Sequence, residues 1–296
     1  MVGAFDPGIM AWRYYNSVED GARVSKGWFK VVAAEYLNEG KYNDDEDAWY
    51  YADGSGHLYA GKFETIKGKK YAFKNDGRMI SGLHFILVDK DTPSLTVMDD
   101  DDKDLPFDTE DGFLDSALKY NADGYDCYYF GGGEDGSMKT NKTNVTIDGD
   151  NFNFYFSKSG STKGTGINGE KDDKYYLAGM LLKAGSDEKY QAITYVDDGD
   201  GLGWTKLPGF DEVKDAAGVK ASGVSKENVD AAKAACKAFN KKVDDLKELY
   251  ILEDNDMKLV NTSGTVAKKN TKNKDGNDYV YVTDNKGNVK VVYVED

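Results

Sequence analysis

The chain has 296 residues and a formal net charge of −15, because 53 acidic side chains outnumber 38 basic ones. That balance disfavours nucleic acids and anionic membrane surfaces as partners, since both are bound through clustered cations. With 21 Tyr, 13 Phe and 4 Trp, the chain also differs from disordered segments, which are poor in aromatic residues. We therefore expect a folded protein whose thin layers are held by half-exposed rings more than by aliphatic side chains.

The first third of the chain carries a short repeated pattern. Residues 12–28 (WRYYNSVEDGARVSKGW) combine aromatic residues, an Asp-Gly turn and a closing Gly-Trp pair. Residues 49–83 contain the pattern twice, as an aromatic triplet, a Gly turn and a short run that ends at Gly61 or Gly82. Asp-Gly between strand-like runs is a strong hairpin signal, and a repeat of about 20 residues predicts a stacked array. The predicted fold class is mostly β, with tandem β-hairpins in a solenoid-like arrangement.

The hairpin repeat becomes less regular toward the C-terminus, and this change predicts three blocks. Residues 1–88 form a first hairpin-repeat block that ends in an apolar strand, 83–88 (LHFILV). Residues 89–170 form a second hairpin block after an acidic linker, and residues 171–296 form a divergent β region with longer, more aliphatic strands. Smaller expected features are a strand at 29–32, a turn at 66–70 and about two helical turns at Phe113, Leu114, Ala117 and Leu118.

Residues 211–251 have a different periodicity. Residues 211–217 predict a short helix that ends at Gly218. Ser225 is a suitable N-cap, and the apolar residues after it alternate at spacings of three and four: Val229, Ala232, Cys236, Phe239, Val243, Leu246 and Tyr250. This stripe predicts an amphipathic helix of about 25 residues at 225–251, inserted before the last strands. Its apolar face either packs on a neighbouring sheet or docks a partner helix.

No catalytic motif is present: the sequence lacks GxSxG, HExxH, a P-loop and a dinucleotide-binding turn. We therefore predict no enzyme, no catalytic residue and no cofactor. The alternative is an enzyme domain within 170–296, which would show a deep pocket with converging carboxylates. The acidic loop 197–200 is not an EF-hand, because Gly209 stands where the last Ca²⁺ ligand belongs. His57 and His84 are isolated, so we predict no metal site.

Aromatic residues in the repeats offer a binding chemistry. Neighbouring residues of a strand point to opposite faces, so Trp49 and Tyr51 share one face and Tyr50 takes the other. Exposed rings bind quaternary ammonium groups by cation–π attraction, worth about 0.5–2 kcal/mol, and they stack on sugar rings. The alternative is that the rings only supply the hydrophobic contact between thin hairpins.

The segments WYYADGSGHLYAG and YAFKNDGRMISG, with the Gly-Trp at 27–28, resemble the cell-wall-binding repeats of Gram-positive surface proteins. That family includes choline-binding modules, glucan-binding repeats and the C-terminal repeats of large clostridial toxins. The resemblance is good over 12–83, looser over 128–166 and marginal over 175–195 and 279–292. It implies a β-hairpin solenoid, a non-enzymatic binding role and display outside the cell.

The resemblance also implies a ligand site, which in this family is a cage of Trp and Tyr from consecutive hairpins. The candidate ligand-binding residues are Trp28, Trp49 and Tyr51, followed by Tyr50 and Tyr71. This chain departs from the family pattern because neither Gly61 nor Gly82 is followed by Trp.

The predicted function is a non-catalytic cell-wall or glycan-binding module of a secreted bacterial surface protein, without membrane insertion. Because the chain opens with MVGAFDPG and no signal peptide, we expect that a leader, and an upstream region, have been removed. The ligand (choline, teichoic acid, glucan or none) stays open, as does the disulfide state of Cys127 and Cys236. The alternative function is a protein-interaction or spacer module whose rings are only structural and whose partner docks on the 225–251 helix.

Overall fold

The computed structural model describes residues 2–6, 11–15, 21–88, 95–97 and 107–296. Contacts group the chain into two compact units. The N-terminal unit comprises residues 1–105, 124–143 and 156–165, and the C-terminal unit comprises 106–123, 144–155 and 166–296. The predicted division at 88 and 170 therefore differs from this grouping and stays a prediction.

Short antiparallel hairpins build the N-terminal unit. Its sheets pair β1 with β2, β3 with β4, β5 with β6, and β7 with both β8 and β9. The elements are β1 (Val2–Asp6), β2 (Ala11–Tyr15), β3 (Gly27–Val32), α1 (Glu39–Asn43), β4 (Asp47–Ala52), β5 (Lys62–Ile66), β6 (Lys69–Phe73), β7 (Leu83–Val88), β8 (Leu95–Val97) and β9 (Asp126–Tyr129). The predicted strands at 29–32 and 83–88 are confirmed.

Larger sheets build the C-terminal unit, to which most of β10 and β11 belongs. The strand orders are β10-β11-β14-β13-β12, β16-β15-β19 and β17-β18-β22-β21-β20. The strands are β10 (Asn141–Ile147), β11 (Asp150–Phe156), β12 (Gly169–Lys171), β13 (Lys174–Leu177), β14 (Met180–Leu181), β15 (Gln191–Asp197), β16 (Leu202–Leu207), β17 (Val219–Ser222), β18 (Leu246–Leu252), β19 (Lys258–Val260), β20 (Lys272–Lys274), β21 (Tyr279–Thr283) and β22 (Val289–Glu295). The helices are α2 (Glu110–Ala122), α3 (Phe210–Ala217), α4 (Lys226–Ala235) and the 3-10 turn η1 (Val243–Asp245).

Two-residue turns close the tightest hairpins. The turn between β5 and β6 places Lys67 at φ 48° and Gly68 at φ 81°. Asp148 and Gly149 repeat this between β10 and β11, at φ 47° and 83°. Positive φ at both central residues is the type I′ geometry, whose twist matches that of the flanking strands. The turn predicted at 66–70 is confirmed.

A second turn recurs in both units and is closed by an Asp or Asn side chain. In each copy the Oδ1 atom accepts hydrogen bonds from the backbone N–H groups two and four residues later, at 2.8–2.9 Å. The fourth residue is a glycine at φ 73–87°, a region that costs other residues strain. We call these the Asx turns, and they begin at Asp53, Asn261 and Asp284.

The two units have different kinds of core. Rings dominate in the N-terminal unit, where Tyr14, Phe29 and Tyr50 pack with Ala52 and Leu58. Aliphatic residues dominate in the C-terminal sheet β17-β18-β22-β21-β20, which buries one cluster on each face. The expectation of aromatic layers therefore fits the repeats and fails for this sheet.

The helix predicted over 225–251 is much shorter, and this prediction is wrong in length. Ser225 caps it as expected, accepting from the N–H of Asn228 at 3.1 Å, but α4 ends at Ala235. Cys236 is already extended, Val243 lies in η1, and β18 holds the last two residues of the stripe, Leu246 and Tyr250. Leu-Tyr-Ile-Leu favours a strand because aromatic and branched side chains suit a pleated, half-buried surface.

The apolar side of α4 is covered by its own sheet. Val229 and Ala232 are 3% and 0% exposed and belong to the same cluster as Leu249, Val282 and Val291. A partner that docks on this face would have to displace the sheet, which counts against the expected protein partner at 225–251. The helices predicted at 113–118 and 211–217 are confirmed as α2 and α3, and Gly218 ends α3 as expected.

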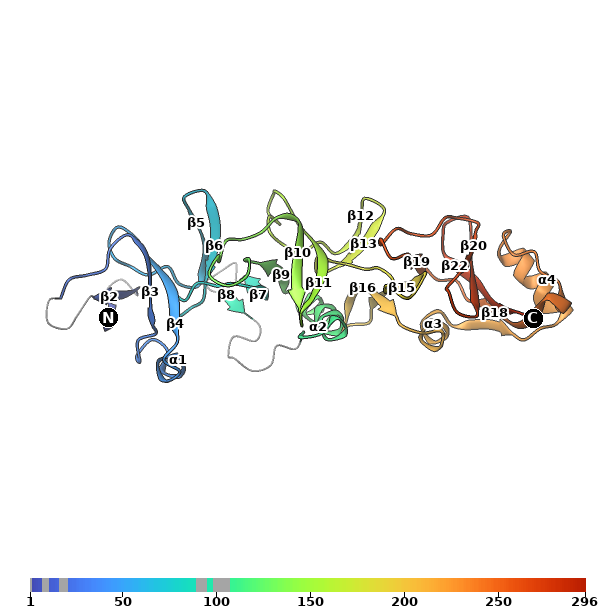
Figure 1. The fold of residues 1–296 in the computed structure, drawn as a ribbon, viewed down its shortest axis with the longest axis horizontal. Helices are drawn as coiled ribbons and strands as arrows, with labels where there is room; N and C mark the ends of the chain where they lie inside the picture. The colour runs from blue at the N-terminus through green and yellow to red at the C-terminus, as the bar shows by residue number, and fades with distance from the viewer. Residues whose placement is uncertain (1, 7–10, 16–20, 89–94, 98–106) are drawn as a thin grey trace. The chain divides into compact units, whose positions relative to one another are not determined.

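The fold is mostly β, as predicted. Figure 1 shows hairpins and small sheets with short helices between them. That the hairpins form a solenoid stays a prediction.

The Asx turns yield a stability prediction. Asp284→Ala removes the acceptor of two backbone N–H groups, so we expect it to lower the free energy of unfolding by about 1–2 kcal/mol. Asp284→Asn keeps the acceptor atom, as the natural Asn261 does in the equivalent turn, and should behave like wild type. Urea unfolding of the three proteins measures this, and equal losses in both variants would contradict the side-chain role.

The carboxylate of Glu295 yields a pH prediction. Hydrogen bonds from Lys241 and then from Lys274, at 2.8 and 3.0 Å, lower the pKa of Glu295 to about 2. A carboxylate whose pKa is lower in the folded protein than in the unfolded chain stabilises the fold at pH values above its unfolded-state pKa. This stabilisation is lost as the pH falls from about 4.5 to 2. Glu295→Gln should therefore cost about 1 kcal/mol at pH 7, reduced by solvent screening, and nothing near pH 2.

Unfolding of Glu295→Gln at several pH values checks this expectation. Glu253→Gln is the matched control, because Glu253 is exposed and forms no ion pair with any residue that the structure describes. A pH-independent loss in Glu295→Gln would contradict the prediction.

Candidate functional site

An aromatic cluster joins two consecutive hairpins of the N-terminal unit. Register places Trp28 of β3 directly opposite Tyr51 of β4, and Lys30 opposite Trp49. From the next hairpin, β6 contributes Tyr71 and Phe73, and the segment between the hairpins contributes Tyr59. We call these six rings the Trp28 cluster: Trp28, Trp49, Tyr51, Tyr59, Tyr71 and Phe73.

Trp28 is the centre of this cluster. Its ring centroid lies 5.1 Å from that of Tyr51, 4.9 Å from that of Tyr71 and 5.8 Å from that of Phe73. Trp49 lies farther out, at 6.4 Å and nearly perpendicular. All of the rings are half-buried except Phe73, which is 0% exposed. The structure thus brings together four of the five predicted site residues.

Tyr50, the fifth predicted site residue, lies elsewhere. It is 0% exposed and packs on Tyr14 and Phe29, with ring centroids 5.3 and 5.7 Å away. Burial raises its pKa far above the usual value. Since strand neighbours alternate between faces, Tyr50 belongs to the core and has no surface to offer to a ligand.

The rings of the Trp28 cluster fill the space between them. Their edge-to-face contacts at 4.9–5.1 Å are those of rings in direct contact. An ammonium would need to sit over ring faces within about 6 Å of several centroids. At Tyr59 that place is taken by the chain's own Lys62, whose Nζ lies 4.5 Å from the ring centroid. The cluster therefore offers outer ring faces and edges, and no open cage.

The phenols of the cluster remain hydrogen-bond donors. Burial raises the pKa of Tyr71 and of Tyr59, with smaller contributions from Asp135 and Glu64 respectively. Both hydroxyls are therefore protonated at neutral pH. A ligand above these rings would meet an apolar face with O–H groups at its rim.

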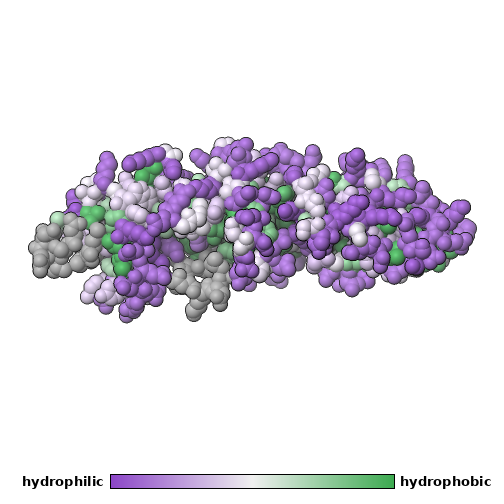
Figure 2. Space-filling view, viewed as in Figure 1, coloured by the Kyte–Doolittle hydropathy of each residue, from purple (hydrophilic) through white to green (hydrophobic). Residues whose placement is uncertain are grey.

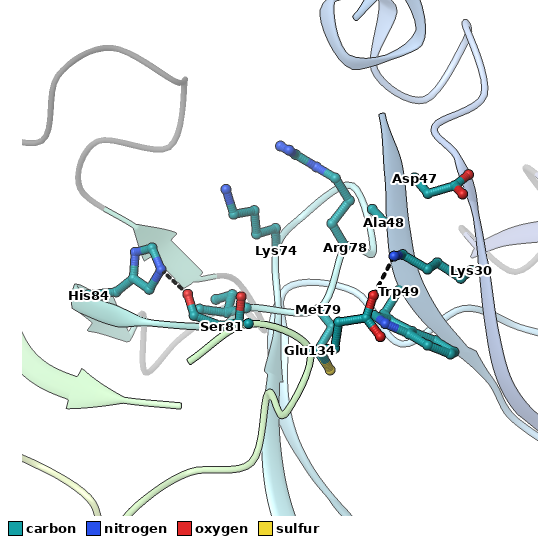
Figure 3. Close-up of a pocket in the computed structure, with 12 residues that line it drawn as sticks. Lys30, Asp47, Ala48, Trp49, Lys74, Arg78, Met79, Ser81, His84 and Glu134 are labelled. Carbon is teal, nitrogen blue, oxygen red and sulfur yellow. Dashed lines mark hydrogen bonds and ion pairs between the residues drawn. The ribbon is translucent and has the colours of Figure 1, made fainter. Parts of the chain in front are cut away.

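Beside the cluster lies a cavity of about 290 Å³ (Figure 3). Trp49 forms one side of it, with Met79 and Ile80 from the segment after β6. The other lining residues are mostly polar or charged: Lys30, Asp47, Lys74, Arg78, Ser81, His84 and Glu134. We call it the Trp49 cavity.

Polar contacts hold several side chains of the Trp49 cavity in place. Lys30 Nζ forms an ion pair with Glu134 at 2.5 Å, and His84 Nε2 hydrogen-bonds the Ser81 carbonyl at 2.6 Å (Figure 3). Arg78 Nε forms an ion pair with Asp76 at 2.6 Å. The cavity therefore presents an indole next to fixed donors and acceptors of both charges. Such a mixture suits a neutral or weakly charged ligand that is rich in hydroxyl groups.

A second ring group was missed from the sequence. In the C-terminal unit, Trp204 of β16 lies opposite Tyr195 of β15, and Tyr175 of β13 contacts it at 4.4 Å. Tyr195 is 49% exposed. The sequence signal for this group is a Tyr and a Trp in the runs on either side of the acidic 197–200 loop. In the structure Asp198 accepts from the N–H groups of Asp200 and Gly201 and closes a turn.

Other site chemistries find little support in the described residues. Within them, no group of three His, Cys, Asp or Glu residues is arranged to hold a metal ion. Cys127 and Cys236 are both buried free thiols, and burial raises the pKa of each. No helix in the described ranges is long and apolar enough to cross a bilayer. In Figure 2 hydrophilic residues cover most of the visible face, and hydrophobic residues appear there as small separate areas.

The position of Trp28 yields a prediction that separates structural from binding roles. Trp28→Ala should lower the free energy of unfolding of the N-terminal unit by about 3 kcal/mol, the low end for Trp truncation, because the ring is half-buried. Trp49→Ala should cost less, since Trp49 contacts the cluster at its edge. Near-UV circular dichroism during urea unfolding measures both, and equal costs would contradict Trp28 as the centre.

No family model matches the chain, and no curated protein matches it either. Among solved structures, choline binding protein F of Streptococcus pneumoniae, with a peptidoglycan analogue, is 18% identical with a TM-score of 0.35, over 68% of this chain and 51% of that one. The pneumococcal cell wall endolysin of phage Cp-1, complexed with choline, is 15% identical with a TM-score of 0.27, over 62% and 38%. Alternansucrase in complex with isomaltononaose is 16% identical with a TM-score of 0.25, over 97% and 16%.

The chain thus spans about half of choline binding protein F and smaller shares of the other two proteins. At these identities and TM-scores the matches do not establish membership of a family.

Proposed function

We propose that this chain is a non-catalytic module that binds a cell-wall polymer or another glycan. The observation that carries the proposal is the Trp49 cavity, where an indole stands beside Ser81, His84 and charged side chains. A sugar ring has an apolar C–H face, which stacks on an aromatic plane, and hydroxyl groups, which need donors and acceptors at its rim. The Trp49 cavity provides both the aromatic plane and the hydrogen-bonding groups.

The Trp28 cluster supports this function by holding Trp49 in place. Because Trp28 contacts both Tyr51 and Tyr71, these rings act as the hydrophobic contact between hairpins. Trp49 and the phenol rims of Tyr59 and Tyr71 are then the parts that meet a ligand. Of the predicted site residues, Trp49 and Tyr71 stay ligand contacts in this proposal, and Trp28 and Tyr51 become positioning residues.

A polymeric ligand suits weak sites of this kind. Further ring groups, such as Trp204 with Tyr195, add contacts to the same polymer through effective concentration rather than through one deep pocket. A wall polymer is reached only outside the cell, so the proposal places this chain in a secreted protein at the surface of a Gram-positive bacterium.

Retention on purified Gram-positive cell walls and on a glycan array tests the proposal. The wild-type chain should be retained, and Trp49→Ala should lower retention roughly fivefold, the equivalent of about 1 kcal/mol for one stacking ring. Tyr36→Ala is the matched control, because Tyr36 is 84% exposed and lies outside the cluster. The control should bind like wild type.

Choline in the wash buffer distinguishes the ligand classes. Because the rings of the Trp28 cluster are closed on one another, we expect free choline to leave retention unchanged. Elution by choline would show that the rings open around an ammonium and would overturn the assignment of Trp49 as a sugar contact. Failure of wild type to bind walls or any glycan would overturn the function.

A further inference from the structure

A second cavity, in the C-terminal unit, is lined by an excess of positive charge. It measures about 420 Å³ and lies among the β12–β13 hairpin, the start of β19 and two turns. Four lysines line it, Lys258, Lys268, Lys269 and Lys286, against two carboxylates, Glu170 and Asp173. In the chain as a whole, acidic residues outnumber basic ones by 53 to 38. The balance of charge is thus reversed at this place, which we call the lysine cavity.

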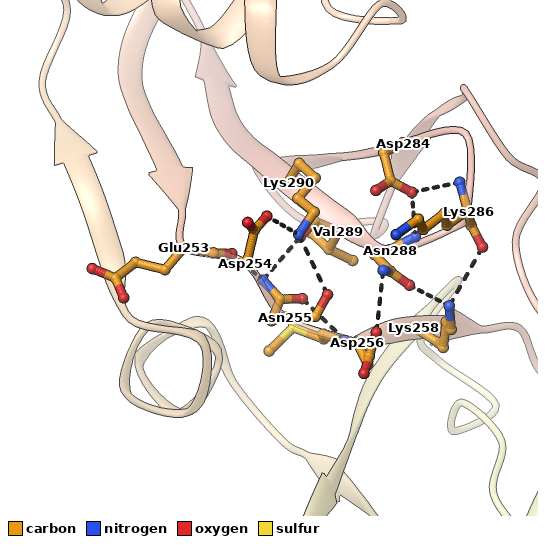
Figure 4. A network of polar contacts seen from close by, with 11 residues as sticks. Glu253, Asp254, Asn255, Asp256, Lys258, Asp284, Lys286, Asn288, Val289 and Lys290 are labelled. Atoms are coloured by element: carbon orange, nitrogen blue, oxygen red, sulfur yellow. Dashed lines mark hydrogen bonds and ion pairs between the residues drawn. The ribbon is translucent and has the colours of Figure 1, made fainter.

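None of these four ammonium groups is neutralised by a carboxylate within the described residues. Lys258 Nζ donates to the side-chain oxygen of Asn288 and to the carbonyl of Lys286, the latter at 3.4 Å (Figure 4). Both acceptors are uncharged. The neighbouring Lys290 differs, since it forms an ion pair with Asp254 at 3.0 Å. The nearby carboxylate of Glu170 accepts a hydrogen bond from Tyr175 at 3.3 Å.

The ammonium group of the half-buried Lys258 is less favourable than an exposed one, because burial removes part of its hydration. Burial is the largest influence on Lys258 and lowers its pKa; Asp256, Asp284 and Glu170 raise the pKa, and Lys269 lowers it by the smallest of these contributions. A bound anion would offset the cost of burying the Lys258 ammonium. Among the residues that line the cavity, four ammonium groups stand against two carboxylates, and an oxyanion would balance this excess.

The backbone that carries the lysines is fixed before any ligand arrives. Lys286 lies in the Asx turn closed by Asp284, and the turn that precedes Lys268 is closed by Asn261. The N–H of Ala267 bonds the carbonyl of Leu259 at 2.8 Å, which ties the same segment to β19. Fixed positions reduce the ordering cost of binding.

We propose that the lysine cavity binds an anionic group, a phosphodiester or a carboxylate, of the polymer that the chain recognises. A lysine ammonium is a point charge that suits phosphate and carboxylate oxygens. A concave site of local positive charge attracts such a group to a chain whose net charge otherwise repels it. This inference deepens the proposed function by naming the chemical class of the ligand, and it rests on that function for the source of the anion.

Calorimetric titration with three probes tests the inference: short polyglycerol phosphate, oligogalacturonate and a neutral glucan oligomer. Wild type should bind at least one of the two anionic probes, and its affinity should fall with added salt because the charges are screened. The double variant Lys269→Gln with Lys286→Gln should weaken that binding about tenfold. These two side chains are exposed and make no side-chain hydrogen bond in the described residues, so their replacement should leave the thermal midpoint unchanged.

The matched control is Lys220→Gln with Lys237→Gln, which removes the same charge from exposed positions outside the cavity. It should bind within twofold of wild type. The anionic probe that binds identifies the source, phosphate or carboxylate. Equal binding by wild type and the cavity variant, equal weakening in both double variants, or no binding of either anionic probe would overturn the inference.

The two proposals fail in different ways. If Trp49→Ala lowers the retention on walls that wild type shows, while the lysine variant binds the anionic probes as wild type does, the lysine cavity is wrong and the function stands. If polyglycerol phosphate binds in a lysine-dependent way but no wall or glycan retains the chain, the anion site stands and the function is wrong.

Discussion

Contact between rings of successive hairpins is the interaction on which the N-terminal unit depends. An isolated two-stranded hairpin is at best marginally stable in water, and β3–β4 and β5–β6 each form a sheet of only two strands. Trp28 contacts rings from both hairpins and so joins two elements that share no strand pairing. The same packing closes the space in which a ligand cage would form, so stability and ligand choice are linked at one side chain.

Local patterns made much of this fold predictable. The turn at 66–70, the cap at Ser225 and the end of α3 at Gly218 follow from residues that lie close together in sequence. The length of α4 does not, because the same apolar spacing serves a helix up to Ala235 and a strand from Leu246 onward. Only pairing with β22, distant in sequence, decides between them.

The candidate site was predictable in part for the same reason. Strand alternation correctly separates Tyr50 from Trp49 and Tyr51, and the burial of Tyr50 removes it from the candidate site. The Trp49 cavity depends on Gly133 and Glu134, which follow β9, and the lysine cavity joins segments about 100 residues apart. Contacts between segments so far apart in sequence arise from the tertiary structure, and a single sequence contains no periodic pattern that predicts them.

Each Asx turn is complete within five consecutive residues, because its acceptor, its two N–H donors and its glycine are all local. The side-chain bonds that close the turn therefore depend on no distant residue, whereas the backbone carbonyls of the same residues join it to the rest of the unit, as the Asn261 carbonyl does by accepting from the N–H of Ala184. The conformation of each turn is thus set locally, by one acceptor side chain and one glycine, while its position in the unit is set by the bonds of its backbone carbonyls.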